Sequence, residues 1–157
     1  MQRYKFIYLA TLLLLSLAIT PLTLLADADK SNAKNETQNV VIHLSKYTND
    51  LHASFMAFKL ATELKKAGAN VTVFLDLEGV RSADKRQPQD LTWGMGNSGD
   101  FAAIYQSFIN AGGEVLVCPH CAKSVGMSEK DLRAGAKLAT VQKITKLILS
   151  ADKIMDY

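Results

Sequence analysis

Residues 113–121 have the sequence Gly-Glu-Val-Leu-Val-Cys-Pro-His-Cys, in which a short apolar run ends at the first of two cysteines. The central Val-Leu-Val triplet contains no polar residue, which is typical of a strand buried on both faces of a parallel sheet. Pro119 suits the first position of a helix, because its missing N–H needs no partner there. We therefore predict a buried strand that ends at Cys118 and is followed at once by a helical turn.

The rest of the chain repeats this alternation of apolar strands and amphipathic helices. Val40 opens a similar apolar run, and Asp100 is placed to cap a helix with one apolar face. Such alternation favours a parallel sheet with helices on both faces, so we predict an α/β protein, a three-layer α/β/α sandwich of Rossmann-like type. Predicted strands are 40–44, 71–75, 114–117 and 153–155, and predicted helices are 51–67, 101–111 and 141–149, with a short helix opened by a capping box at Ser128.

Residues 1–28 have the features of a secretory signal peptide. Arg3 and Lys5 provide a positive start, no charged residue occurs from 6 to 26, and small residues at 26–28 offer a cleavage site. We therefore expect export to the periplasm or the cell exterior. If the segment is not cleaved, it is long and apolar enough to anchor the protein in a membrane.

The remaining chain is expected to form a linker and one compact domain. Residues 29–38 are polar and contain almost nothing to bury, whereas residues 39–157 are enough for a single hydrophobic core. The whole chain carries a formal net charge of +3, and removal of residues 1–28 leaves about +2. A charge this small argues against nucleic-acid binding.

Cys118 and Cys121 are the two cysteines of the sequence and form a Cys-x-x-Cys pair. Two cysteines are too few for a disulfide scaffold, and their closeness indicates local thiol chemistry instead. At the start of a helix, free N–H groups and the helix dipole stabilise the thiolate of Cys118. We predict that Cys118 is the nucleophile, that Cys121 resolves a mixed disulfide or accepts sulfur, and that His120 adds positive charge nearby.

The Cys-x-x-Cys motif has three alternative interpretations. A disulfide between the cysteines would only pin the loop in an oxidising compartment. A zinc or copper site would need His43 or His52 to join the motif, and since no fourth ligand is evident we assign no metal or other cofactor. Cys-Pro-His-Cys also occurs in strongly oxidising thioredoxin-fold enzymes, but these place the pair near their N-terminus and need a later cis-proline, and no proline follows Pro119.

The predicted topology indicates where a site would form. In parallel α/β sheets, ligands bind beyond the carboxyl ends of the strands. Residues 45–50, 76–99 and 118–126 must all emerge at that edge, so the cysteines lie where such folds place their chemistry. The 76–99 segment is long and has no clean period, which is typical of a functional or mobile loop.

Within that segment, Glu78 and Trp93 are the predicted substrate-pocket residues over Cys118. Glu78 has two interpretations: it either influences the thiol across the strand edge or serves as a turn residue. Trp93 packs the loop down more often than it binds a ligand in such positions. His43 lies inside an apolar strand and is expected to be a hydrogen-bonded core histidine.

Three stretches together carry a family resemblance. Residues 40–68 form an opening strand and helix, residues 74–80 read Phe-Leu-Asp-Leu-Glu-Gly-Val, and residues 113–118 end at Cys118 with Gly126 eight residues later. In this order and spacing, the chain resembles the DsrE/DsrF-like sulfur-relay family with its TusD-type subunits. The resemblance implies a DsrE-like fold that forms homotrimers or hexamers. It also implies that Cys118 holds sulfur as a persulfide and exchanges it with a donor or acceptor protein or a small sulfur compound.

These observations predict an exported protein of sulfur or thiol chemistry, acting as a sulfur carrier, sulfurtransferase or thiol-redox protein. The alternative is a non-catalytic oligomeric module that binds a small ligand or metal at the same sheet edge. A third interpretation is a purely structural exported subunit, which cysteines inert to mild alkylation would favour. Sulfur uptake that depends on Cys118 would distinguish the first function from the second.

Overall fold

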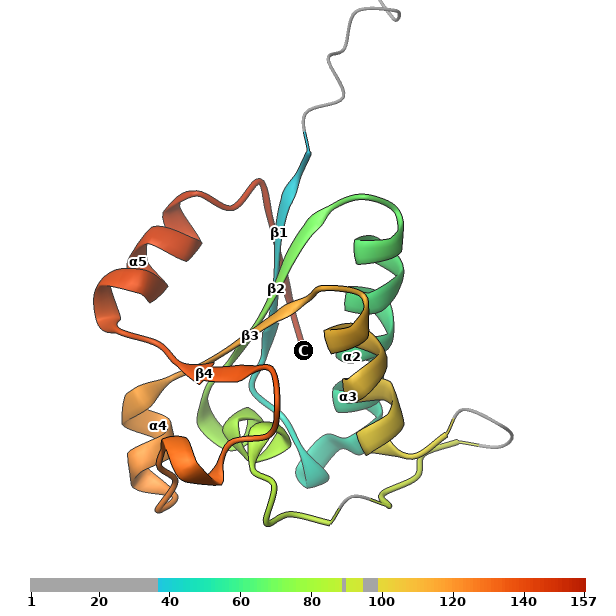
Figure 1. The fold of residues 1–157 in the computed structure, drawn as a ribbon, viewed down its shortest axis with the longest axis vertical. Helices are drawn as coiled ribbons and strands as arrows, with labels where there is room; N and C mark the ends of the chain where they lie inside the picture. Colours follow the sequence, from blue (N-terminus) through green and yellow to red (C-terminus); the bar gives the residue numbers. More distant parts are fainter. Residues whose placement is uncertain (1–36, 89, 95–98) are drawn as a thin grey trace, which may run out of the picture. The chain divides into compact units, whose positions relative to one another are not determined.

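The computed structural model describes residues 37–88, 90–94 and 99–157, which fold around one five-stranded sheet (Figure 1). The strands lie in the order β4-β3-β2-β1-β5, and each neighbouring pair is parallel. They are β1 (Asn39–Leu44), β2 (Asn70–Leu75), β3 (Glu114–Val117), β4 (Ala136–Leu138) and β5 (Lys153–Asp156). The helices are α2 (Leu51–Lys66), α3 (Phe101–Asn110), α4 (Pro119–Ser124) and α5 (Val141–Leu149), with the 3-10 helices η1 (Thr48–Asp50), η2 (Leu77–Ala83) and η3 (Glu129–Asp131).

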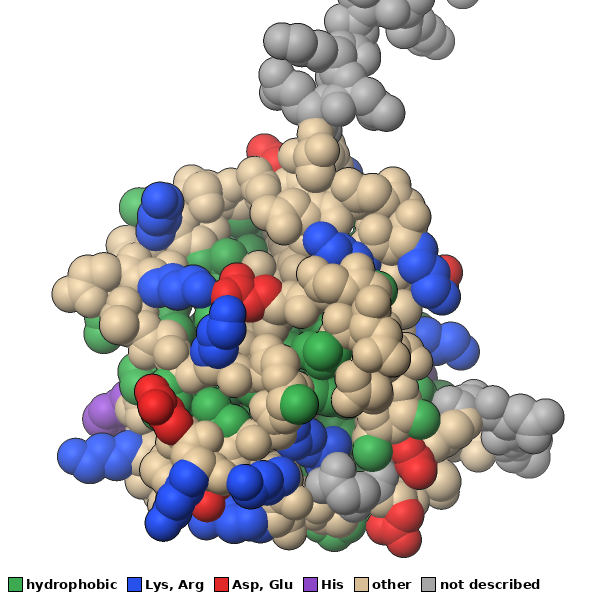
Figure 2. Space-filling model, viewed as in Figure 1, with side chains coloured by type: hydrophobic (Ala, Val, Ile, Leu, Met, Phe, Trp, Pro, Cys, Tyr) green, Lys and Arg blue, Asp and Glu red, His purple; other side chains and the backbone are tan. Residues whose placement is uncertain are grey.

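Helices cover both faces of the sheet, as predicted. In Figure 1, α2 and α3 lie on one side of the sheet and α5 on the other. Because successive side chains of a strand point to opposite faces, each central strand contributes to two cores. The core on the side of α2 and α3 includes Ile42, Val73, Val115, Phe58 and Phe108. The smaller core on the side of α5 is formed by Val41, Phe74, Leu116 and Ala139, with Ile144, Leu147, Cys118 and Ala151 packed against it. On the face drawn in Figure 2, some hydrophobic side chains also reach the surface between charged ones.

Three helices begin where the sequence predicts them. The side chains of Asp50, Asp100 and Thr140 each accept a hydrogen bond from a backbone N–H in the first turn of α2, α3 and α5. Such N-caps satisfy N–H groups that have no partner inside the helix and contribute about 1 kcal/mol each. The strongest local signals in the sequence therefore set the helix boundaries of the fold.

Three elements differ from the prediction. The 3-10 helix η2 lies within residues 76–99, where no helix was predicted. The capping box at Ser128 is present, but it opens the single 3-10 turn η3 and not an α-helix. Strand β4 was not predicted, because its three residues have Lys137 at the centre and show no apolar run. Its backbone pairs with β3 at the sheet edge, where a short strand needs little burial of its own.

The predicted signal peptide, residues 1–28, and residues 29–36 of the predicted linker lie outside the described residues. Within the part of the chain that the structure describes, no helix combines the length and apolar character needed to cross a bilayer.

Candidate functional site

The strand register brings three residues together at the carboxyl edge of the sheet. Leu44, Leu75 and Val117 are aligned on neighbouring strands β1, β2 and β3. Asp76 and Cys118 each follow such a residue directly, and the backbone N–H of Cys118 donates to the carbonyl oxygen of Leu75 across 2.8 Å. Since neighbouring strands lie about 4.8 Å apart, Cys118 and the turn after β2 are direct neighbours.

Cys118 is the N-cap residue of α4, with Pro119 at the first helical position as predicted. Its Sγ accepts a hydrogen bond from the backbone N–H of Cys121, with 3.5 Å between the sulfur and nitrogen atoms. A negative sulfur at this position is stabilised by that N–H. Both cysteines are partly buried, and no disulfide joins them.

Cys121 has a different environment from Cys118. Burial, the hydrogen bond with Cys118 and the negative charges of Cys118 and Asp76 raise the pKa of the Cys121 thiol, although a hydrogen bond from the backbone of Leu77 opposes them. Cys121 therefore holds its proton more firmly than an ordinary cysteine. A thiol of this kind reacts after its proton has been removed.

The turn after β2 is constrained where it meets Cys121. Leu77 has φ 42°, which makes it the one non-glycine residue with positive φ among the described residues. Gly79 lies so close to the end of β1 that a side chain there would overlap the carbonyl oxygen of Leu44. The strained backbone of Leu77 is therefore held in place by the packing of η2 against β1.

His43 lies between two carboxylates at the same sheet edge. Its Nδ1 is 2.6 Å from Asp156 Oδ1, and its Nε2 makes an ion-pair contact of 2.9 Å with Asp76 Oδ1. Burial alone would lower the pKa of His43, but the hydrogen bonds and charges of Asp156 and Asp76 outweigh it and raise the pKa. His43 is hydrogen-bonded as predicted, but its side chain keeps 26% exposure at the sheet edge, so its description as a core residue is wrong.

The family is decided by a match over nearly the whole described domain. The sequence model of the DsrE/DsrF-like family matches residues 38–157. The chain belongs to the DsrE/DsrF-like family. This confirms the resemblance inferred from the three sequence stretches, and it indicates a function of the general sulfur-relay type.

Relatives of this DsrE/DsrF-like chain occur in archaea. It is 29% identical over 119 residues to the uncharacterized protein MJ0989 of Methanocaldococcus jannaschii, covering 75% of this chain and 96% of the relative. It is 27% identical over 102 residues to the uncharacterized protein MK0008 of Methanopyrus kandleri, covering 65% and 79%.

Two solved structures have a similar fold. The YchN protein of E. coli superposes with a TM-score of 0.62 at 22% identity, covering 77% of this chain and all of that one. MTH1491 of Methanobacterium thermoautotrophicum, whose function is unknown, gives a TM-score of 0.54 at 14% identity and covers 76% and 99%. The predicted α/β fold of DsrE-like type is thereby confirmed.

Among the described residues, Glu78 and Trp93 make their ion-pair and ring contacts with partners other than the two thiols. Glu78 pairs with Arg81 across 2.8 Å in η2. Trp93 stacks on His52 of α2, with 3.7 Å between the ring centroids. His120 is exposed on α4. The carboxylate that acts on Cys121 is Asp76, which the sequence analysis did not single out, although its position directly after a buried strand was a usable signal.

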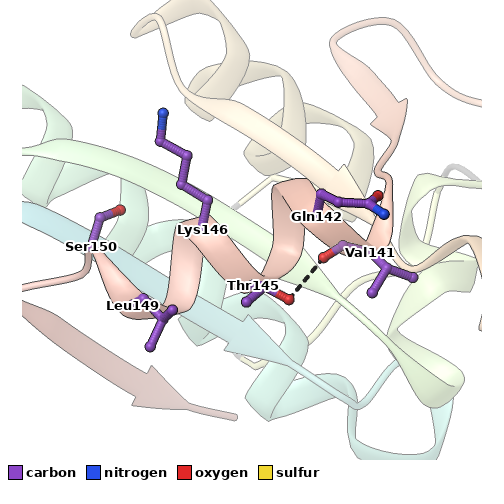
Figure 3. A pocket seen from close by; sticks show the side chains of 6 residues that line it. All are labelled: Val141, Gln142, Thr145, Lys146, Leu149 and Ser150. Atoms are coloured by element: carbon purple, nitrogen blue, oxygen red, sulfur yellow. Dashed lines mark hydrogen bonds between the residues drawn. The ribbon is translucent and has the colours of Figure 1, made fainter.

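A separate hollow lies on the outer side of α5, away from the thiols. It measures about 470 Å³ and is lined by residues of that helix, among them Val141 and Leu149, as Figure 3 shows. It contains no cysteine, histidine or carboxylate, so it offers no groups for thiol chemistry. Among the described residues, no three histidine, cysteine or acidic side chains are arranged to hold a metal ion.

Proposed function

We propose that the protein carries sulfur on Cys118 as a persulfide and that Cys121 resolves the loaded state. The observation that carries this proposal is the asymmetric thiol pair. The sulfur of Cys118 faces a backbone N–H donor, whereas burial and neighbouring charge raise the pKa of Cys121. Membership in a sulfur-relay family supports the same assignment of chemistry.

The loading step moves one sulfur atom from a donor persulfide to Cys118. The Cys118 thiolate attacks the outer sulfur of a donor persulfide, R–S–SH, and the S–S bond of the donor breaks. Cys118 then holds S–SH, and the donor leaves as the thiolate R–S⁻. The backbone N–H of Cys121 stabilises the attacking charge on Cys118 before the new S–S bond forms.

The loaded sulfur has two routes out. An acceptor thiolate takes the outer sulfur and returns Cys118 as a thiolate, which is relay. Alternatively, Cys121 attacks the inner sulfur of the persulfide, so that a Cys118–Cys121 disulfide forms and hydrosulfide leaves. In the second route Cys121 unloads the persulfide. The outer sulfur is reduced to hydrosulfide, and the two cysteines are oxidised to a disulfide.

Intact mass spectrometry tests the carrier function directly. The reduced protein is treated with inorganic polysulfide, desalted and weighed, in parallel with Cys118→Ser and Cys121→Ser. We expect Cys121→Ser to retain added sulfur and Cys118→Ser to gain none. Equal sulfur uptake in Cys118→Ser would refute the assignment of the carrier.

We also propose that a second copy of the chain covers the outer face of α5 and β5. Val141 and Leu149 of α5 are 67% and 81% exposed, and Ile154 of β5, which pairs with Val41 and so lies on the α5 side of the sheet, is also exposed. Val141, Thr145 and Leu149 are spaced four residues apart, so they share one face of α5 (Figure 3).

Light scattering of the purified protein tests this interface. The homotrimer or hexamer implied by the family resemblance should dissociate in Leu149→Lys but not in Lys143→Glu, a change on the same helix. Export is proposed as well, on the basis of the signal-like residues 1–28. Cell fractionation with N-terminal sequencing tests it, and a cytoplasmic protein that retains Met1 would contradict it.

A further inference from the structure

A row of ionisable side chains crosses the carboxyl edge of the sheet and ends at the resolving cysteine. Asp156 comes from β5, His43 from β1 and Asp76 from the turn after β2. The imidazole contacts both carboxylates, at 2.6 Å and 2.9 Å. These residues come from three neighbouring parts of the sheet, and α4, which carries Cys121, packs against η2 directly after Asp76.

The contact between His43 and Asp76 is shielded from water. His43 Nε2 and Asp76 Oδ1 are both buried, and neither makes another hydrogen bond within the described residues. The imidazole also stacks on Phe74, 5.6 Å between centroids. The charged groups that act on His43 come from β5 and from the turn after β2, while the elements on the α5 side contribute apolar side chains to this face.

Asp76 is placed next to the thiol pair by the backbone on both sides of it. The residue before it, Leu75, accepts the N–H of Cys118 across 2.8 Å. The residue after it, Leu77, directs its backbone N–H at the sulfur of Cys121, and the charge of Asp76 acts on that same sulfur. The Oδ1 atom of Asp76 contacts His43. The Asp76 side chain is nevertheless 24% exposed, so the rest of its carboxylate remains accessible.

We propose that Asp76 accepts the proton of Cys121 during resolution and that His43, fixed by Asp156, positions the Asp76 carboxylate for this transfer. The inference rests on the proposed function, in which Cys121 attacks the sulfur bound to Cys118. It assigns a role to three residues outside the Cys-x-x-Cys motif. His43 and Asp156 act through Asp76 and are positioning residues.

The step balances in atoms and electrons. The Cys121 proton moves to Asp76, and the Cys121 sulfur attacks the inner sulfur of Cys118–S–SH. The bond between the two persulfide sulfurs breaks, and hydrosulfide leaves with the electron pair. Asp76 then returns the proton to the hydrosulfide, which departs as hydrogen sulfide. Two thiol sulfurs become a disulfide, and one sulfane sulfur is reduced.

A mixed disulfide tests the proton transfer without any bound sulfane sulfur. An aromatic disulfide reagent that releases a coloured thiolate is mixed with the reduced full-length protein in a stopped-flow instrument. The first coloured phase reports attack by Cys118. The second phase reports displacement of the aromatic thiolate from Cys118 by Cys121. Because Cys121→Ser lacks the attacking thiol, it should show no second phase, which identifies that phase.

Asp76→Asn is expected to slow the second phase by roughly 100-fold near neutral pH, the typical loss for a missing general base. The loss should disappear at high pH, where Cys121 ionises without help. His43→Gln should slow the second phase by about tenfold and shift its pH profile. The first phase should be unchanged in both variants, which also shows that the site is folded. His52→Gln on α2 is the matched control and should leave both phases unchanged.

Whether Asp76→Asn slows or accelerates the second phase distinguishes a proton-accepting role of Asp76 from a purely electrostatic one. If Asp76 acted only as a negative charge, its removal would lower the pKa of Cys121 and accelerate the second phase. An equal or faster second phase in Asp76→Asn overturns the proposal. A polysulfide arm, read by hydrogen sulfide release and intact mass, tests sulfur loading separately. Failure to load sulfur would sink the carrier function, while the mixed-disulfide phases still decide the role of Asp76.

Discussion

The sulfur of Cys118 accepts the backbone N–H of Cys121 across 3.5 Å, so the second cysteine stabilises negative charge on the first through its backbone. The reverse contact does not help Cys121, because the charge of Cys118 raises the pKa of the Cys121 thiol. The two cysteines are therefore unequal before any substrate binds. This inequality gives the pair a direction, with Cys118 attacking first and Cys121 second.

Alkylation rates should reveal this inequality. Near pH 7 we expect Cys121→Ser, which retains Cys118, to react faster with iodoacetamide than Cys118→Ser, which retains Cys121, because burial and the charge of Asp76 still raise the pKa of Cys121 in the second variant. Mass spectrometry of quenched samples gives both rates. Equal rates between the two variants would contradict the assigned order of attack.

Stability should depend on pH through His43. The folded-state pKa of His43 lies above its ordinary value of 6.5, so its contribution is fully present below that pH and is lost as the pH rises through the folded-state pKa. His43→Gln should therefore be less stable than the parent protein below pH 6.5, by on the order of 1 kcal/mol for a partly exposed ion pair, and the difference should shrink at higher pH.

Urea denaturation at several pH values measures this dependence, with His52→Gln as control. The control should show no such convergence, because His52 stacks on Trp93 and contacts no carboxylate in the described residues. A difference that widens with rising pH would contradict the raised pKa of His43.

Gly79→Ala should destabilise the domain strongly. The added methyl group would overlap the Leu44 carbonyl, so η2 would have to move away from β1, at a cost of about 3 kcal/mol or more. Gly126→Ala is the matched control, because its positive φ is strained but its surroundings are open, which costs roughly 1 kcal/mol. Thermal unfolding of both variants gives the comparison. Equal losses would show that η2 is not held against β1.

Arg133→Met should leave the domain as stable or make it more stable. The guanidinium is buried over the rings of Phe101 and Tyr105, and the hydroxyl of Tyr47 and the charge of Asp84 only partly offset the cost of its burial. Burial lowers the pKa of Arg133, so its charge is held at a cost. Replacement of a buried charge by a flexible apolar side chain is often neutral or stabilising by about 1–2 kcal/mol.

Arg81→Met serves as the control for that change. Arg81 pairs with the exposed Glu78 at the surface, and loss of such a pair changes stability by roughly 0.5 kcal/mol or less. The free energy of unfolding, measured in urea, decides both cases. A loss above about 2 kcal/mol in Arg133→Met would mean that the attraction between Arg133 and Asp84 outweighs the cost of burying the guanidinium.

Local signals in the sequence predicted most of the architecture. The capped helix starts at Asp100 and Thr140 and the apolar run at 40–44 depend on neighbouring residues, which one sequence displays directly. Strand β4 escaped prediction because it is short and its central residue is a lysine. Its strand conformation depends on pairing with β3, which local propensity does not encode.

Only part of the site was predicted, again because local sequence patterns do not show contacts between distant residues. Cys118 at the start of a helix follows from a proline, a strand and a motif that are adjacent in sequence. The contact of His43 with Asp156 joins residues 113 positions apart, so no local pattern reveals it. The topology rule did indicate that the turn after β2 would reach the cysteines, and Asp76 was the first residue of that turn.

The strand that supplies Asp156 is the last of the five along the chain, yet it pairs with the first. Closing so long a loop is entropically costly, and contacts between distant residues slow folding. The two thiols come together much earlier on the sequence, within a single helical turn. During synthesis and refolding, the chain therefore passes through an interval in which Cys118 and Cys121 are adjacent but His43 has not yet met Asp156. Oxidation of the two cysteines in that interval would proceed before Asp156 is in contact with His43.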